Sequence, residues 1–181
     1  MLAGVDSEWG YPIVISKVIS KENTLGGDMS YCQFLKKSEV FNLLEEPESK
    51  AVAELAEERK VSRGSIIGKE GDKGEEFYLV VEGQLEISIN AALAEPIPVT
   101  IATVGPGQIS GWSSMYKDGK LTATIKAAKS SKLLVWNAAK LHEFLLRNCG
   151  MGYRILQQLL AVVARRLVNT RVALMGCVME R

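Results

Sequence analysis

The chain has 181 residues, of which 47% are hydrophobic and 24% are charged, an ordinary composition for one soluble globular domain. Its 22 basic residues nearly balance its 21 acidic ones, so no overall charge attracts nucleic acid or an anionic membrane. Any anion site must therefore be local. Cys32, Cys149 and Cys177 lie far apart, which argues against a metal pair or a disulfide framework and is typical of free thiols.

No N-terminal stretch combines a basic head, an apolar run and a small-residue cleavage site, so we expect no secretion signal. The most apolar helical segment, residues 155–167, is interrupted by two glutamines and two arginines, which are costly inside a bilayer. We therefore expect a cytoplasmic protein that does not span a membrane.

Residues 1–28 are interpreted as an N-terminal extension to a domain that covers residues 29–181. Residues 11–20 have a β-branched, strand-like pattern, which the Gly-Gly-Asp triplet before Met29 ends. Codons for that triplet can resemble a ribosome-binding site, which gives the hypothesis that translation starts at Met29. A start at Met1 is the alternative.

Residues 31–60 show a helical pattern of apolar residues, which predicts N-terminal helices over this whole stretch. Pro47 interrupts the pattern, so we expect one helix before it and a second helix that Ser49 caps. Acidic residues near the start of the second helix and basic residues near its end match the helix dipole.

Residues 61–137 change to a two-residue alternation, which predicts strands. Residues 77–89 alternate on both sides of Gly83, which predicts a hairpin with glycine at its turn. Residues 98–104 and 121–136 supply further strands. Many short antiparallel strands with glycine corners predict a mainly β fold with flanking helices, an antiparallel double-stranded β-helix of the jelly-roll or cupin-like type.

Residues 138–175 return to a helical pattern, in which Asn137 is placed to cap a short helix and residues 148–150 break it from a long one. An apolar stripe follows the long helix, at Ile155, Leu159, Val162, Val163, Leu167 and Leu174. The predicted roll is too small to cover the whole length of this helix by itself. We therefore expect a homodimer through residues 150–174, with packing wholly on its own subunit as the alternative.

Several segments resemble the cyclic-nucleotide-binding domain family, and their glycines have the family spacing. The resemblance to the first half of that domain lies at residues 64–67, 71–72, 77–80 and 83–85. The resemblance to its phosphate-binding cassette lies at residues 105–111 and 121–125. Residues 164–167 resemble the dimerising helix of catabolite-activator-type regulators. The resemblance covers about residues 31–175 and implies a stand-alone regulatory β-roll.

The cassette departs from the family at two positions. In the family a Glu follows the cassette glycine, here Gly111, and an Arg precedes a Ser/Thr-Ala pair, here residues 122–123. This chain has Trp112 and Leu121 instead. Because a buried phosphodiester needs a paired cation that Leu121 does not supply, we do not expect cyclic AMP to bind in the usual way.

Nine residues are candidates for a modified ligand site: Gly111, Trp112, Ser113, Ser114, Leu121, Thr122, Ala123, Thr170 and Arg171. The two serines offer hydroxyls at the cassette helix, and Thr170 and Arg171 have the family offset that faces a nucleotide base. Lys117 and Lys120 are a further source of positive charge. The open alternatives are a small anionic or nucleotide-like ligand and a vestigial pocket. No cofactor is expected.

Enzymatic and metal chemistry lack the residues that they need. The single histidine, His142, is predicted on the short helix beyond the strands, where no Ser-His-Asp arrangement is evident, and a cupin-type metal site needs several imidazoles. Neither a Walker-type loop nor a GxGxxG motif is present. We therefore expect no catalytic residues and no metal, and a protein that is not an enzyme.

Only residues 175–181 follow the predicted long helix, so we expect no DNA-binding element in this chain. The arginines of the helix alternate with its apolar stripe and are expected at a dimer rim; they are Arg154, Arg165, Arg166 and Arg171. The sequence thus favours a homodimeric sensor. The alternatives are a degenerate module that dimerises without a ligand, and the sensor half of a transcription regulator.

Overall fold

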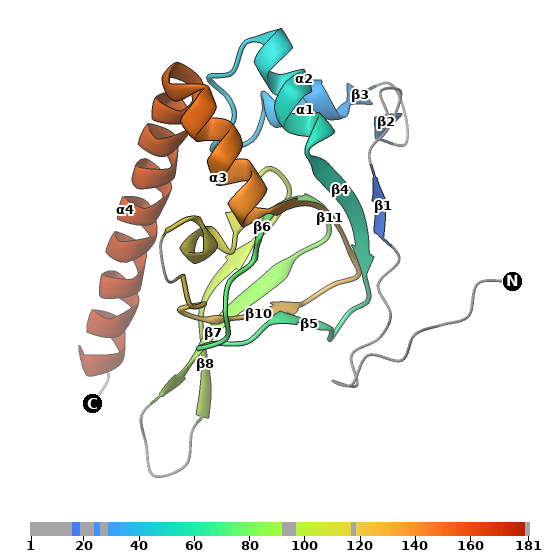
Figure 1. Cartoon of the computed structure of the whole chain (residues 1–181). Helices are drawn as coiled ribbons and strands as arrows, with labels where there is room; N and C mark the ends of the chain where they lie inside the picture. The colour runs from blue at the N-terminus through green and yellow to red at the C-terminus, as the bar shows by residue number, and fades with distance from the viewer. Residues whose placement is uncertain (1–15, 19–23, 26–28, 92–96, 117–118, 180–181) are drawn as a thin grey trace, which may run out of the picture.

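Figure 1 shows the computed structural model of the chain, in which a roll of strands has short helices at one end and a long helix alongside. The structure describes residues 16–18, 24–25, 29–91, 97–116 and 119–179. The predicted strand at residues 11–20 is thus described only at residues 16–18. Lys117 lies outside the described residues, as do the side chains of Leu174 and Cys177.

Two sheets form the roll. The first runs in the order β1 (Ser16–Val18), β4 (Ala56–Val61), β11 (Ser131–Asn137), β6 (Glu76–Glu82) and β9 (Ile109–Ser110). The second runs β5 (Ile66–Gly68), β10 (Thr124–Ala127), β7 (Leu85–Ala91) and β8 (Ile97–Val104). A separate ladder joins β2 (Thr24–Leu25) and β3 (Met29–Ser30). These strands pair antiparallel, which confirms the predicted fold class.

Strand β6 is buried on both faces. Tyr78 and Val80 belong to the core between the two sheets, whereas Phe77 and Leu79 belong to a second core that the helices cover. A strand that is covered on both faces needs apolar residues at successive positions, which explains its nearly continuous apolar sequence. The first sheet is therefore the middle layer of the fold.

The predicted hairpin across residues 77–89 is wrong, because β6 and β7 belong to different sheets. β6 pairs with β11 and β9, whereas β7 pairs with β10 and β8. Gly83 between them has a φ of +89°, and a Cβ there would lie 2.5 Å from the carbonyl oxygen of Ser130. It turns the corner from one sheet to the other. Alternation predicts that strands exist, but it does not determine their partners.

The N-terminal helices end earlier than predicted. Helices α1 (Tyr31–Leu35) and α2 (Glu46–Glu54) are present, but residues 56–60 belong to β4 and not to a helix. β4 pairs with β11 on one side and β1 on the other. Its run of charged residues resembles a solvated helix end in the sequence. The ladder with β11 is a long-range interaction that outweighs this local preference.

Helix α2 also begins earlier than predicted. Glu45, not Ser49, is its N-cap, and Glu48 completes a capping box by accepting the Glu45 backbone N–H at 2.9 Å. Pro47 lies in the first turn, where its missing N–H removes no helical hydrogen bond. Pro47 therefore starts this helix and does not interrupt it.

The two C-terminal helices are α3 (Ala138–Arg147) and α4 (Cys149–Met179), as predicted. Asn137 caps α3, because its Oδ1 accepts the backbone N–H of Lys140 at 3.0 Å. Within the stripe of α4, Ile155 and Val162 are buried in the core that the helices cover, whereas Leu167 is half exposed. No helix in the described part of the chain is long and apolar enough to cross a membrane.

Three of the arginines predicted for a dimer rim pair with acidic residues of their own chain: Arg154, Arg165 and Arg166. Arg154 pairs with Glu48 of α2, and Arg166 pairs with Glu39, which lies between α1 and α2. Both guanidinium groups are partly buried in these contacts. The apolar stripe and these ion pairs together dock α4 on the roll.

Candidate ligand-binding site

A tight turn connects β9 to the short 3-10 helix η1 (Trp112–Met115). Gly111 in this turn has a φ of +73°, and a Cβ there would lie 2.8 Å from both the Glu76 carbonyl oxygen and the Tyr78 ring. Glycine is therefore required at this position. The backbone N–H and hydroxyl of Ser114 both donate to the Gly111 carbonyl, at 3.0 and 2.6 Å.

An ion pair lies below this turn. Arg59 donates two hydrogen bonds of 2.6 Å to the Glu76 carboxylate, which also accepts the Tyr78 hydroxyl at 3.0 Å. Burial by itself would raise the pKa of Glu76, but the hydrogen bonds and charge of Arg59 lower it below its ordinary value. Burial raises the pKa of Tyr78, so its hydroxyl stays protonated. These contacts hold the turn in place.

The second part of the cassette is tied to the loop after β5. The Leu121 N–H donates to the Asp72 carbonyl, and the Leu121 carbonyl accepts the Gly71 N–H, each at 2.8 Å. The Leu121 side chain is 6% exposed, and a Cβ on Gly68 would lie 2.5 Å from its Cδ1. Leucine therefore fills the space beside Gly68.

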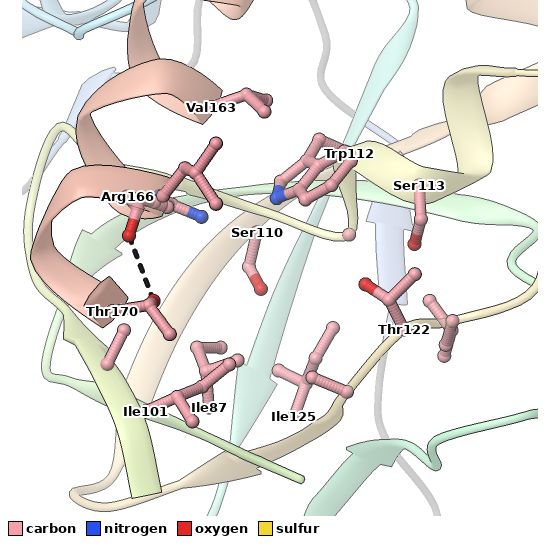
Figure 2. Close-up of a pocket in the computed structure, with 15 residues that line it drawn as sticks. Ile87, Ile101, Ser110, Trp112, Ser113, Thr122, Ile125, Val163, Arg166 and Thr170 are labelled. Atoms are coloured by element: carbon pink, nitrogen blue, oxygen red, sulfur yellow. Dashed lines mark hydrogen bonds between the residues drawn. The ribbon is translucent and has the colours of Figure 1, made fainter. Parts of the chain in front are cut away.

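A cavity of about 240 Å³ lies between the roll, the cassette and α4; we call it the central pocket. Figure 2 shows its floor of isoleucines, with Trp112 and Ser113 on one side and α4 on another. Its lining comprises Ile87, Ile101, Ala102, Ser110, Gly111, Trp112, Ser113, Leu121, Thr122, Ala123, Ile125, Val163, Arg166, Leu167 and Thr170. Five separate segments of the chain thus form one site.

Seven of the nine predicted site residues line the central pocket: Gly111, Trp112, Ser113, Leu121, Thr122, Ala123 and Thr170. The other two do not. Ser114 lines an outer groove with His142 and caps the turn with its hydroxyl. Arg171 is exposed, because it follows Thr170 by about 100° around the helix and so points away from the pocket.

Arg166 is the site residue that sequence reasoning missed. Its side chain is 19% exposed, and its Nη2 donates to Glu39 Oε1 at 3.1 Å and to the Ile109 carbonyl at 2.5 Å. Burial lowers the pKa of its guanidinium, the Glu39 charge opposes this, and the group remains protonated. Its position one turn before Thr170 was the available signal, because residues four apart share a helix face.

The polar groups of the pocket form two clusters in Figure 2. The indole nitrogen of Trp112 faces the guanidinium of Arg166, and the hydroxyls of Ser113 and Thr122 face each other on the opposite side. Ser110 and Ser113 are 2% and 3% exposed. Within the described part of the chain, neither serine hydroxyl has a hydrogen-bond partner, although both line the cavity.

The fold and site define an antiparallel β-roll with a glycine turn, a short cassette helix and a long helix over a pocket. Residues 58–148, half of the chain, match the cyclic nucleotide-binding domain family. The chain therefore belongs to this family.

Relatives and solved structures agree with this assignment. The cAMP-dependent protein kinase regulatory subunit of Pyricularia oryzae is 30% identical over 125 residues, which are 69% of this chain and 31% of that protein. A candidate cyclic nucleotide-binding protein of Geobacter metallireducens superposes with a TM-score of 0.66 at 29% identity, over 77% of this chain and 99% of the other.

The catabolite activator protein of Thermus thermophilus gives a TM-score of 0.65 at 24% identity, over 79% of this chain and 64% of that one, which shows a shared fold alone. The chain spans about a third or less of the curated relatives that it matches, namely 31%, 25% and 22% of their lengths.

Proposed function

We propose that this chain is a regulatory module that binds a small ligand in the central pocket, is not an enzyme, and does not bind cyclic AMP in the usual way. The observation on which the proposal depends is the packing of Leu121. It is buried against Gly68 at the position where the family places a phosphate-binding arginine. A phosphodiester at this position would lose its water without gaining a cation, which is unfavourable.

Trp112 supports the same conclusion. At this position the family has a Glu, which accepts a hydrogen bond from the ribose hydroxyl. The indole of Trp112 is a donor only and has no acceptor to offer. Arg166 is the only cation among the described residues that line the pocket, and it comes from α4 and not from the cassette.

The unpaired hydroxyls of Ser110 and Ser113 support a ligand over a vestigial pocket. Both residues are nearly buried, but both line the cavity, where a ligand or water can hydrogen-bond to their hydroxyls. A pocket that had lost its ligand would be expected to replace such serines with apolar residues.

The exposed face of α4 supports dimerisation as part of the function. Four large apolar side chains at helical spacing are 50–68% exposed: Tyr153, Leu156, Leu160 and Leu167. The first three border an apolar groove of about 520 Å³ between η1, α3 and α4, whereas Leu167 lines the central pocket. We propose that a second copy of α4 covers this face. The same exposed face also supports the alternative, a module that dimerises without a ligand.

A thermal-unfolding screen separates these candidates. A ligand present at 100 times its dissociation constant stabilises the folded chain by about 2.7 kcal/mol. We expect no stabilisation by micromolar cyclic AMP or cyclic GMP. The matched variant carries both Trp112→Glu and Leu121→Arg, which restore the family pair, and it should gain stabilisation by cyclic AMP. Stabilisation of the unaltered chain by micromolar cyclic AMP would contradict the proposal.

A further inference from the structure

We propose that the ligand of the central pocket is a small organic acid with a mostly apolar body, and that its acid group binds Arg166 and Trp112. The anion is then held by α4 and the first residue of η1, and not by residues 121–123. This inference rests on the proposed function, because it names the ligand class of the same pocket.

The first argument is the local charge. Arg165 and Arg166 both pair with Glu39, at 2.5 and 3.1 Å, and Glu39 Oε1 also accepts the Ile109 N–H at 2.9 Å. Two guanidinium groups thus face one carboxylate. No other carboxylate of the described residues pairs with either arginine. One positive charge is therefore left for a ligand at the edge of the pocket.

The second argument is the set of free donors. Arg166 uses only Nη2 for its bonds to Glu39 and the Ile109 carbonyl. Its Nη1 and Nε bear three further N–H groups, which donate to no described residue. A guanidinium binds a carboxylate best through two parallel hydrogen bonds, and this geometry remains available. The indole N–H of Trp112 faces the same space and supplies one more donor (Figure 2).

The third argument is the remainder of the pocket. Ile87, Ile101 and Ile125 form its floor, and Leu121 closes it where the family has a cation. At about 240 Å³ the cavity is smaller than the roughly 300–1,000 Å³ of pockets for drug-sized ligands. A small apolar body therefore fits, and the facing hydroxyls of Ser113 and Thr122 suit an uncharged oxygen on it (Figure 2).

Binding of an acid at this position would involve the contact that docks α4. Arg166 bonds the carbonyl of Ile109 in β9, two residues before the glycine turn. A ligand on the same guanidinium therefore contacts the residue that joins α4 to the cassette. This gives the ligand a direct effect on the position of α4, because it interacts differently with docked and undocked states of the helix.

The test compares acids with their uncharged amides on the full chain. Thermal unfolding and calorimetric titration are carried out with phenylacetate and hexanoate, and in parallel with phenylacetamide and hexanamide. We expect the acids to stabilise the chain and the amides to have little effect. Arg166→Gln should weaken acid binding at least about tenfold, because it removes a charge-assisted bidentate contact. Arg171→Gln, the same change five residues along α4 at an exposed position, should leave it unaltered.

A second variant keeps the test decisive if Arg166→Gln unfolds. Trp112→Phe keeps the aromatic volume, removes the indole N–H and should weaken acid binding severalfold. Equal binding of acids and amides would overturn the inference and leave the proposed function standing. Binding that Arg171→Gln abolishes and Arg166→Gln does not would also overturn it. If none of these probes binds at millimolar concentration while cyclic AMP binds at micromolar concentration, both proposals are wrong.

Discussion

The two walls of the central pocket differ in the side chains that they present. The cassette wall has Gly111 at a φ of +73° with η1 directly after it, and it presents an indole and a leucine. The α4 wall presents the cation, Arg166, together with the hydroxyl of Thr170. Backbone shape and side-chain chemistry are therefore separable in this fold, because the turn is held by its contacts with Glu76 and Tyr78 of β6. Four variants test this difference between the walls.

We expect the largest effect on stability from Gly111→Ala, which changes the backbone turn in the cassette wall. Its Cβ would meet the Glu76 carbonyl and the Tyr78 ring at 2.8 Å, in a left-handed conformation. We expect a loss of about 2–4 kcal/mol in the free energy of unfolding, measured by urea denaturation. The matched control is Gly71→Ala, where φ is +87° but no atom lies within 4 Å of the added carbon. It should cost only about 1 kcal/mol. Equal losses would show that the close contacts are unimportant.

Leu160→Glu tests the outer face of α4. Leu160 is 68% exposed, and burying a charge without a partner in an interface of two copies is costly. We expect analytical ultracentrifugation to show a shift from dimer to monomer, with a loss of about 2–3 kcal/mol in association free energy. Ala139→Glu introduces the same charge at an exposed site on α3 and should leave the dimer intact. If the unaltered chain itself sediments as a monomer, the proposed dimer is wrong.

The ion pair below the cassette predicts an acid-sensitive stability. The folded-state pKa of Glu76 is lowered, so its contribution is complete above the unfolded value of about 4.3 and is lost as the pH falls through the folded value. Glu76→Gln should therefore be less stable at neutral pH, by about 1–2 kcal/mol, and should show a flatter acid limb. Glu75→Gln changes an exposed neighbour, and it should alter neither the stability at neutral pH nor its dependence on acid. If Glu76→Gln loses stability at low pH as steeply as the unaltered chain, the Arg59–Glu76 pair is not the source of the acid sensitivity.

The smallest effect is expected from Glu39→Gln, which alters the charge beside the α4 wall and removes only the hydrogen bond from Arg165 to Oε2. The amide oxygen can still accept from Ile109 and Arg166, but it no longer neutralises either arginine. We expect phenylacetate to bind about three to five times more tightly, a gain below 1 kcal/mol, measured by calorimetry. Weaker binding would indicate that Glu39 orients Arg166 more than it competes for its charge.

Sequence reasoning located most of the cassette wall and half of the α4 wall. Gly111 and Trp112 follow from a local motif of glycines, and their neighbours in space are also their neighbours in the chain. Arg166 was assigned to a dimer rim, because nothing in the helical pattern reveals an acidic partner 127 residues away. Arg171 was placed in the site by family offset, but the helix turns it outwards. A one-residue step around a helix is enough to move a side chain out of a site.

The same distinction applies to the whole fold. The sequence alone predicted the β-roll, the Asn137 cap and the long helix, since these depend on residue type and short-range spacing. Only the tertiary structure decided that residues 56–60 are a strand and that β6 and β7 lie in different sheets. It also decided that the one cation in the described pocket lining comes from α4. Strand partners and ion pairs between distant segments depend on how the whole chain packs, which local patterns do not determine.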